Sequence, residues 1–159
     1  MLGKAVFLGS ACAALMAAAM APQSRASEPA SVSPGDLVAA RQGGMAMSVF
    51  TLARLSAAAT ADAPLTQAAL PTKGLARFAQ ALPTLFAPET AGIEGTEALP
   101  AVWQDEEAFA ARIAEYQAAT AALADAARSD NREAFNTALA STKAACQACH
   151  DAFRAKPQG

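Results

Sequence analysis

Apolar residues recur at helical spacing along four stretches of this chain. The first stretch runs from about residue 34 to 58, and one helix face carries Leu37, Arg41, Met45, Ser48, Leu52 and Leu55. Ser33 is suited to cap this helix, and Pro34 suits its first position. The second stretch runs from about residue 71 to 82, with an apolar stripe of Leu75, Phe78, Ala79 and Leu82. We expect Pro83 to end this helix, because proline lacks the amide hydrogen that the next turn needs.

Two longer stretches follow toward the C-terminus. Asp105 is a natural N-cap for the third, whose seam is Phe109, Ile113, Tyr116, Thr120, Leu123 and Ala127. Asp130 followed by Glu133 predicts a capping box at the start of the fourth helix. The seam of that helix is Phe135, Leu139, Thr142, Cys146, Cys149 and Phe153. Four amphipathic helices, the last two joined by a short turn, predict an all-α protein folded as an antiparallel four-helix bundle.

The connection between the second and third helices is long. Residues 83–103 contain three prolines and two glycines, so we expect a loop there. Most connections in a small domain are short. We therefore interpret this segment as one that packs over something, with Trp103 as its anchor.

Composition predicts one helical domain, and the first residues predict export from the cytosol. Of the 159 residues, 53% are apolar and 16% are charged, and the abundant alanine favours one helical domain. Residues 1–26 resemble a signal peptide, with Lys4 before an apolar run and small residues at Ser24 and Ala26. We predict cleavage after Ala26, export to the periplasm and a mature domain of residues 27–159; an uncleaved membrane anchor is the alternative.

The charge of the mature domain excludes one class of partner. Removing Lys4 and Arg25 from the twelve basic residues leaves ten against fourteen acidic residues, a net charge of −4. Nucleic-acid binding normally requires a basic face, so this charge argues against it. No stretch after the leader is long and apolar enough in sequence to span a bilayer.

The pentapeptide CQACH holds the chain's only histidine. Cys146 and Cys149 are three residues apart, and His150 follows directly. C-x-x-C-H is the attachment signature of haem c, because two thioethers on one helix face can hold the porphyrin while the histidine binds its iron. A zinc site would need a fourth ligand. A thioredoxin-type C-x-x-C would need a preceding strand. The sequence therefore predicts one covalently attached haem c.

Three stretches resemble one family. They are RQGGM (residues 41–45), FAPETAGIEGTEALPAVWQDEEAF (86–109) and KAACQACHDAFR (143–154), and they are similar to the class II cytochromes c, the family of cytochrome c′. The resemblance implies that His150 is the proximal iron ligand and that Arg154 lies near the proximal haem face. It also implies that Arg41 approaches the haem propionates and that Met45 lies across the iron from His150.

The identity of the distal ligand decides the function. If Met45 binds the iron, the haem is six-coordinate and low-spin and transfers single electrons. If Met45 only packs on the porphyrin, the iron is five-coordinate and binds nitric oxide or carbon monoxide. We expect the first, electron transfer through His150 and Met45 to an unidentified redox partner, and keep the second as the alternative. No acid–base cluster suggests an enzyme.

The first helix carries two further features. Gly43 and Gly44 each cost up to about 1 kcal/mol against alanine inside a helix. We interpret them as making room for the haem edge and for Met45, although a tolerated weak point is the alternative. Met47 lies about 200° round the helix from Met45. Together with Phe50 it is a candidate surface for a homodimer.

Overall fold

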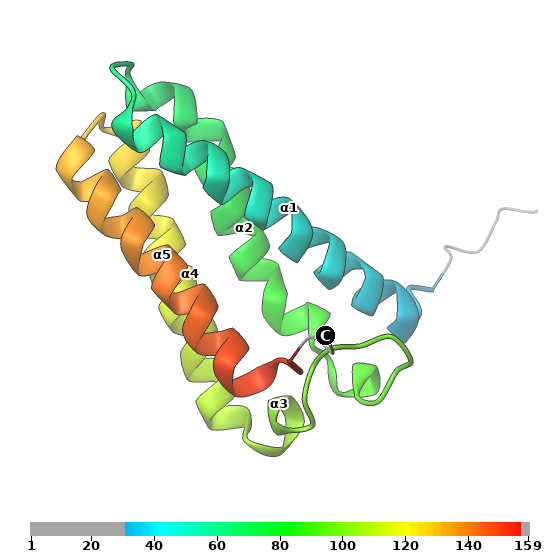
Figure 1. Ribbon diagram of the computed structural model, residues 1–159. Helices are drawn as coiled ribbons and strands as arrows, with labels where there is room; N and C mark the ends of the chain where they lie inside the picture. The colour runs from blue at the N-terminus through cyan, green and yellow to red at the C-terminus, as the bar shows by residue number, and fades with distance from the viewer. Residues whose placement is uncertain (1–30, 157–159) are drawn as a thin grey trace, which may run out of the picture. The chain divides into compact units, whose positions relative to one another are not determined.

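The four long helices form the predicted antiparallel bundle. The computed structural model describes residues 31–156; the predicted signal peptide lies outside them. Figure 1 shows successive long helices running in opposite directions. The elements are α1 (Pro34–Thr60), η1 (Leu65–Ala68), α2 (Ala69–Leu85), η2 (Pro88–Thr90), α3 (Ala101–Gln104), α4 (Glu106–Arg128) and α5 (Arg132–Phe153). None of the helices in residues 31–156 has the length and hydropathy of a membrane span.

The predicted seams of α4 and α5 form the core. All six seam residues of α4 are buried, from Phe109 to Ala127. On α5, four of the six are buried and the two cysteines are half-buried. The buried threonines of this core donate their hydroxyls to carbonyls of the preceding turn, as Thr142 does to Ala138 O at 2.8 Å. The hydroxyls therefore need no partner from another helix.

Two of the three predicted caps are confirmed. Ser33 and Asp36 form a capping box at the start of α1, and Asp105 accepts the Ala108 amide at the start of α4. The prediction that Asp130 caps the last helix is wrong. Asn131 caps α5 instead, while Asp130 has a φ of 54° and accepts the amide of Leu65 at 2.6 Å. Its carboxylate therefore binds the connection between α1 and α2 and does not cap α5.

The prediction that Pro83 ends the second helix is also wrong. α2 continues through Pro83 to Leu85. A proline inside a helix leaves the carbonyl four residues earlier without its amide donor. That carbonyl belongs to Ala79, which is fully buried, and the side chain of Gln117 on α4 donates to it at 3.1 Å. A residue of another helix thus replaces the missing bond.

Replacing Gln117 by alanine is expected to destabilise the protein by about 1–2 kcal/mol, because a buried carbonyl then loses its only donor. The measurement is chemical denaturation of the haem-loaded protein. In a Pro83→Ala background the amide of residue 83 restores the helical bond, so the cost of Gln117→Ala should fall to a few tenths of a kcal/mol. An equal cost in both backgrounds would show that Gln117 does not compensate for Pro83.

The long connection lies at one end of the bundle. η2 and α3 are short helical turns within it, so the expected loop is partly helical. In Figure 1 it surrounds the end where α1 begins and α5 terminates. The indole of Trp103 donates to the carbonyl of Phe86 at 3.0 Å, which confirms the expected anchor. This end of the bundle contains the candidate site.

Candidate functional site

A cavity of about 490 Å³ opens between α1 and α5. Cofactor sites in proteins usually have volumes of this order and mostly apolar walls. The side of α1 contributes Arg41, Gln42, Met45, Ala46 and Val49, and the side of α5 contributes Cys149, His150, Phe153 and Arg154. Phe86, Glu97, Ala98 and Phe109 complete the lining. The structure thus brings together all the predicted site residues except Cys146, which lies one turn before Cys149 on α5.

The walls suit a flat apolar cofactor. Phe109 packs edge-on against Phe86 and Phe153, with ring centroids 4.9 and 5.1 Å apart. Such aromatic groups favour contact with another ring system. Helical spacing places Phe109 and Phe153 on buried seams, and Phe86 belongs to no such seam. Their common cavity is formed by segments far apart in the chain, and helical periodicity does not reveal it.

Both cysteines are held in an apolar setting. Burial raises the pKa of the Cys146 thiol, and burial together with the neighbouring Cys146 raises the pKa of Cys149 to about 11. A buried site disfavours the charged thiolate, whereas a thioether carries no charge and does not titrate. The two positions therefore fit the predicted thioether attachment of a haem.

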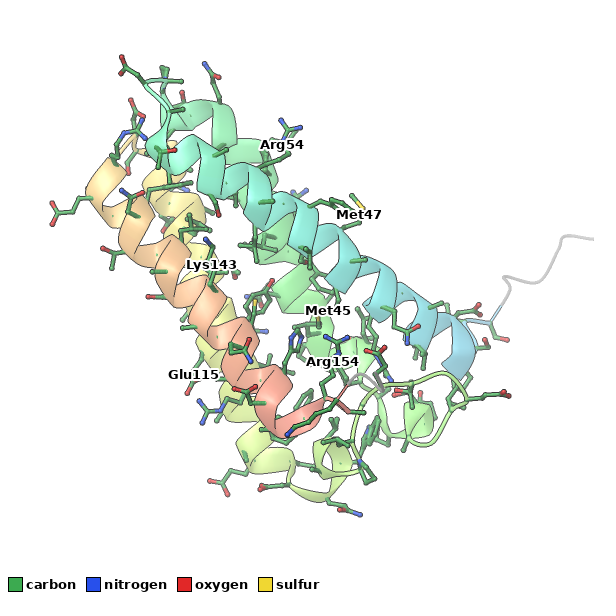
Figure 2. The ribbon with its side chains drawn as sticks, viewed as in Figure 1. Met45, Met47, Arg54, Glu115, Lys143 and Arg154 are labelled. Carbon is green, nitrogen blue, oxygen red and sulfur yellow. The ribbon has the colours of Figure 1, made fainter. Side chains whose placement is uncertain are left out.

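His150 and Met45 lie on the two helices that flank the cavity. Burial, and then the positive charge of Arg154, lowers the pKa of His150, which favours the neutral imidazole that can bind a metal. Met45 is half-buried, and Figure 2 shows it on the inner side of α1, with Met47 pointing away from the bundle. The opposite placement of the two methionines agrees with the expected rotation.

Arg41 is buried, with 3% of its surface exposed, and the protein itself supplies partners for it. Its Nη1 donates to Leu85 O at 3.0 Å and to Thr90 Oγ1 at 2.9 Å, and its Nη2 donates to Thr96 Oγ1. The guanidinium also lies 4.5 Å above the ring of Phe86. Three of its five N–H groups are therefore occupied, one by the last residue of α2 and two by the loop that follows. The contact with a haem propionate that the resemblance implies for Arg41 stays a prediction, and the protein itself already satisfies part of the guanidinium.

Arg154 forms an ion pair that the sequence analysis missed. Its Nε donates to Glu97 Oε2 at 2.8 Å, and both side chains are about half exposed. Both residues line the cavity on the His150 side. Because 57 positions separate them, no local pattern could have identified the pair. The ion pair places one cation and one anion at the rim of the site.

Gly44 makes room for another helix. A Cβ atom built on Gly44 would lie 2.1 Å from Cε2 of Phe78 on α2, whereas one built on Gly43 would meet nothing within 4 Å. The structure therefore connects Gly44 with the packing of α1 on α2. The interpretation that both glycines make room for the haem edge has no support from these contacts.

One protein family, several relatives and several solved structures are similar to this chain. The family described as "Cytochrome C'" matches residues 36–154. A cytochrome c′ of Rubrivivax gelatinosus is 34% identical over 125 residues, covering 77% of this chain and 97% of the relative. The structure of a ferrous variant of cytochrome c prime from Alcaligenes xylosoxidans with bound NO matches at 26% identity, with a TM-score of 0.71 over 80% of this chain and 99% of that one. A cytochrome c′ with ligand-controlled dimer dissociation matches at 27% identity, with a TM-score of 0.72 over 80% and 100%.

Proposed function

The chain belongs to the cytochrome c′ family, whose members carry one covalently attached haem c, and we propose that it binds nitric oxide or carbon monoxide at a five-coordinate haem iron. When bound, the haem supplies an iron with one open axial position for a diatomic ligand. The observation that carries this proposal is the wall of the cavity opposite His150. There α1 presents Met45, Ala46 and Val49, three apolar side chains whose one possible iron ligand is the weak thioether donor of Met45.

The main expectation from the sequence, electron transfer through an iron bound by both His150 and Met45, is wrong. The curated relatives that match this chain are named cytochrome c′. Two matching structures of cytochrome c prime from Alcaligenes xylosoxidans have nitric oxide bound. The gas-binding alternative therefore replaces the electron-transfer function.

Each side chain of the site has a proposed task. Cys146 and Cys149 hold the porphyrin as thioethers on one face of α5, and His150 binds the iron from the same face. Met45 packs over the opposite side, where it excludes water without binding the metal. Its flexible thioether can move aside for a small ligand. We propose a binding role of this kind rather than an enzymatic one.

The two arginines belong to opposite sides of the site. Arg41 has two N–H groups beyond the three that donate to Leu85, Thr90 and Thr96, and we assign these two to a haem propionate. Burial without a carboxylate partner lowers the pKa of Arg41, so a propionate would stabilise the charged form. Replacing Arg41 by glutamine should therefore lower the stability of the haem-loaded protein. It should also lower the reduction potential of the haem, because the loss of a positive charge beside the propionate favours ferric iron. An unchanged potential would contradict the propionate contact.

The spin state of the purified protein tests the main proposal. We expect a high-spin ferric absorption spectrum and a ferrous spectrum that shifts when carbon monoxide is added. Moving and ordering a methionine side chain costs about 1–2 kcal/mol. Replacing Met45 by alanine should therefore leave the ferric spin state unchanged and raise the affinity for carbon monoxide about tenfold.

The opposite result would identify Met45 as a ligand. A low-spin ferric spectrum with the near-infrared sulfur-to-iron band, lost in the Met45→Ala variant, would contradict the five-coordinate site. Met47→Leu is the control, because Met47 lies on the same helix and is 64% exposed, and leucine removes the sulfur while it keeps the apolar outer face of α1. This control variant should bind carbon monoxide with the affinity of the unmodified protein.

We also propose that two copies of the chain associate through the outer face of α1. Met47 and Phe50 are neighbours one turn apart on this face, and 64% and 67% of their surfaces are exposed. Exposed apolar neighbours of this size are typical of an interface. The dimer described for one matching cytochrome c′ makes a second copy the favoured partner. Phe50→Glu should yield a monomer in sedimentation experiments at micromolar concentration, and a dimer that persists would exclude this face.

We place the protein in the periplasm, after removal of residues 1–26. The supporting observation is the signal-like leader. The predicted cleavage site lies outside the described residues. The intact mass of the exported protein should correspond to a chain that begins at Ser27. A mass that includes the apolar leader would instead indicate the membrane-anchored alternative.

A further inference from the structure

Residues 86–99, here called the strap, are bonded to α1 on one side of the cavity. Arg41 donates to the hydroxyl oxygens of Thr90 and Thr96, both within the strap. The next residue of the helix, Gln42, donates through Nε2 to Gly95 O at 2.8 Å. Thr90 is fully buried, so its bond to the guanidinium is shielded from water. These side-chain bonds tie the strap to α1 about two turns from the start of the helix.

The same strap is bonded to the end of α5 by the backbone. The amide of Ala155 donates to Glu97 O at 2.8 Å, and the amide of Leu99 donates to Phe153 O at 2.9 Å. Ala98 and Arg154 form an antiparallel bridge between these bonds. The ion pair of Glu97 with Arg154 adds a side-chain bond at the same place. The strap is therefore attached to both helices that flank the cavity.

α1 and α5 have little direct contact to set their spacing at this end. α5 packs much more extensively on α4 than on α1. In Figure 1 the ribbons of α1 and α5 diverge toward the end that carries the strap. The strap lies between α2 and α3 in the chain, and its hydrogen bonds reach both of the diverging ends. The length and the hydrogen bonds of the strap can therefore determine the distance between α1 and α5 at this end of the bundle.

Each attachment point lies one helical turn from a residue that faces the iron site. Arg41 precedes Met45 by four residues, and Arg154 follows His150 by four residues. Residues four apart lie on one face of a rigid helix. A movement of Arg41 is therefore transmitted along α1 to Met45 with little loss. On the other side Arg154 is the C-cap of α5, with extended backbone, and its amide donates to His150 O at 3.1 Å, so this attachment is linked to His150 by a backbone hydrogen bond.

We propose that the strap sets the separation of Met45 from the iron bound at His150, with Arg41, Thr90 and Thr96 as its positioning residues. The strap holds α1 away from α5, so Met45 covers the distal side without reaching the metal. This inference rests on the proposed gas-binding function. It explains why a buried arginine on the cavity wall has most of its donors directed to a loop rather than to the cavity alone.

The test removes the acceptors in the strap while it leaves the arginine in place. Valine has nearly the shape of threonine but no hydroxyl, so the Thr90→Val, Thr96→Val double variant breaks two bonds of Arg41 at little cost in volume. It also removes two bonds within the strap, from Thr90 Oγ1 to Ala87 O and from Ala98 N to Thr96 Oγ1, so the spin state and the affinity are the measurements that report on Met45. Thr51→Val is the matched control, because Thr51 lies on α1 and its hydroxyl donates only to Met47 O within the same helix. All three proteins are studied with haem attached.

Release of the strap should let the apolar walls approach one another. We expect faster amide hydrogen exchange in residues 86–99 of the double variant, a low-spin component in its ferric spectrum and at least a threefold loss of carbon monoxide affinity. Adding Met45→Leu, which cannot ligate, should abolish the low-spin component. The control variant should match the unmodified protein in all three measurements.

Two results would overturn the proposal. One is faster exchange in the strap with unchanged spin state and unchanged or higher affinity, which would show that the strap does not control Met45. The other is unchanged exchange, which would show that Arg41 does not hold the strap. A second pair of variants, Glu97→Ala with Glu94→Ala as its exposed control, applies the same measurements to the α5 attachment. Failure of the unmodified protein to bind carbon monoxide would instead refute the gas-binding function itself.

Discussion

Replacing both Cys146 and Cys149 by alanine is expected to abolish covalent attachment of haem, so that the exported protein has the mass of the bare polypeptide after denaturation. The bundle should also lose its specific packing. Without the haem, the apolar residues that line the cavity between α1 and α5 lose the large apolar group that would pack against them. Typical domains are stable by only about 5–15 kcal/mol, so the loss of such contacts is a large fraction of the total.

The expected product is a collapsed helical state. Helical far-ultraviolet circular dichroism should persist, because the seams of the four helices remain, while the near-ultraviolet signal disappears and apolar dyes bind. Gln147→Ala is the matched control. Gln147 lies between the two cysteines, but its side chain is exposed and donates to Asp151 at 2.6 Å. This control should retain attached haem and full stability. Covalent haem in the double cysteine variant would refute attachment through these residues.

Replacing Gly44 by alanine is expected to destabilise the haem-loaded protein by about 1–3 kcal/mol, as overpacking of a well-filled interface does. The new methyl group would lie within 2.1–2.7 Å of three atoms of the Phe78 ring, so the ring must leave its position between α1 and α2. Denaturant unfolding followed by circular dichroism measures this loss. The midpoint should fall without a large change in slope.

The neighbouring glycine provides the comparison. A methyl group on Gly43 meets nothing within 4 Å, and alanine is favoured over glycine in a helix by up to about 1 kcal/mol. Gly43→Ala should therefore stabilise the protein slightly, opposite in sign to Gly44→Ala. Equal effects of the two substitutions would show that the Phe78 contact does not constrain α1. Combining Gly44→Ala with Phe78→Leu should recover part of the lost stability, because the smaller side chain leaves space for the methyl group.

Much of the fold and of the proximal side of the site follows from patterns within single segments. The seams of α4 and α5 predicted the buried faces, because residues three and four apart share a helix face. The spacing of Cys146, Cys149 and His150 predicted the haem for the same reason. The long connection was recognised from its prolines and glycines, two of which, Gly92 and Gly95, have positive φ angles that few other residues adopt.

Other features depend on partners that are distant in the sequence. Pro83 was expected to end a helix, and only the amide of Gln117 on another helix allows α2 to continue past it. Arg41 was expected to contact a propionate, and no pattern in the sequence indicated its additional bonds to the end of α2 and to the loop, 44 to 55 positions away. The position of Met45 near the iron site was predicted, but the function predicted for it, ligation of iron in an electron carrier, was wrong. In our proposal the spacing of α1 and α5 determines its role.

The sequence by itself determined where the helices lie, which faces they bury and which three residues carry the attachment signature, because these properties arise from interactions within about one helical turn. The tertiary structure alone decided which groups satisfy the buried carbonyl of Ala79 and the guanidinium of Arg41, and how the cavity between α1 and α5 is bounded. The physical reason is that hydrogen-bond partners and cavity walls are selected by proximity in space. Their energies depend on burial that exists only once the chain has folded.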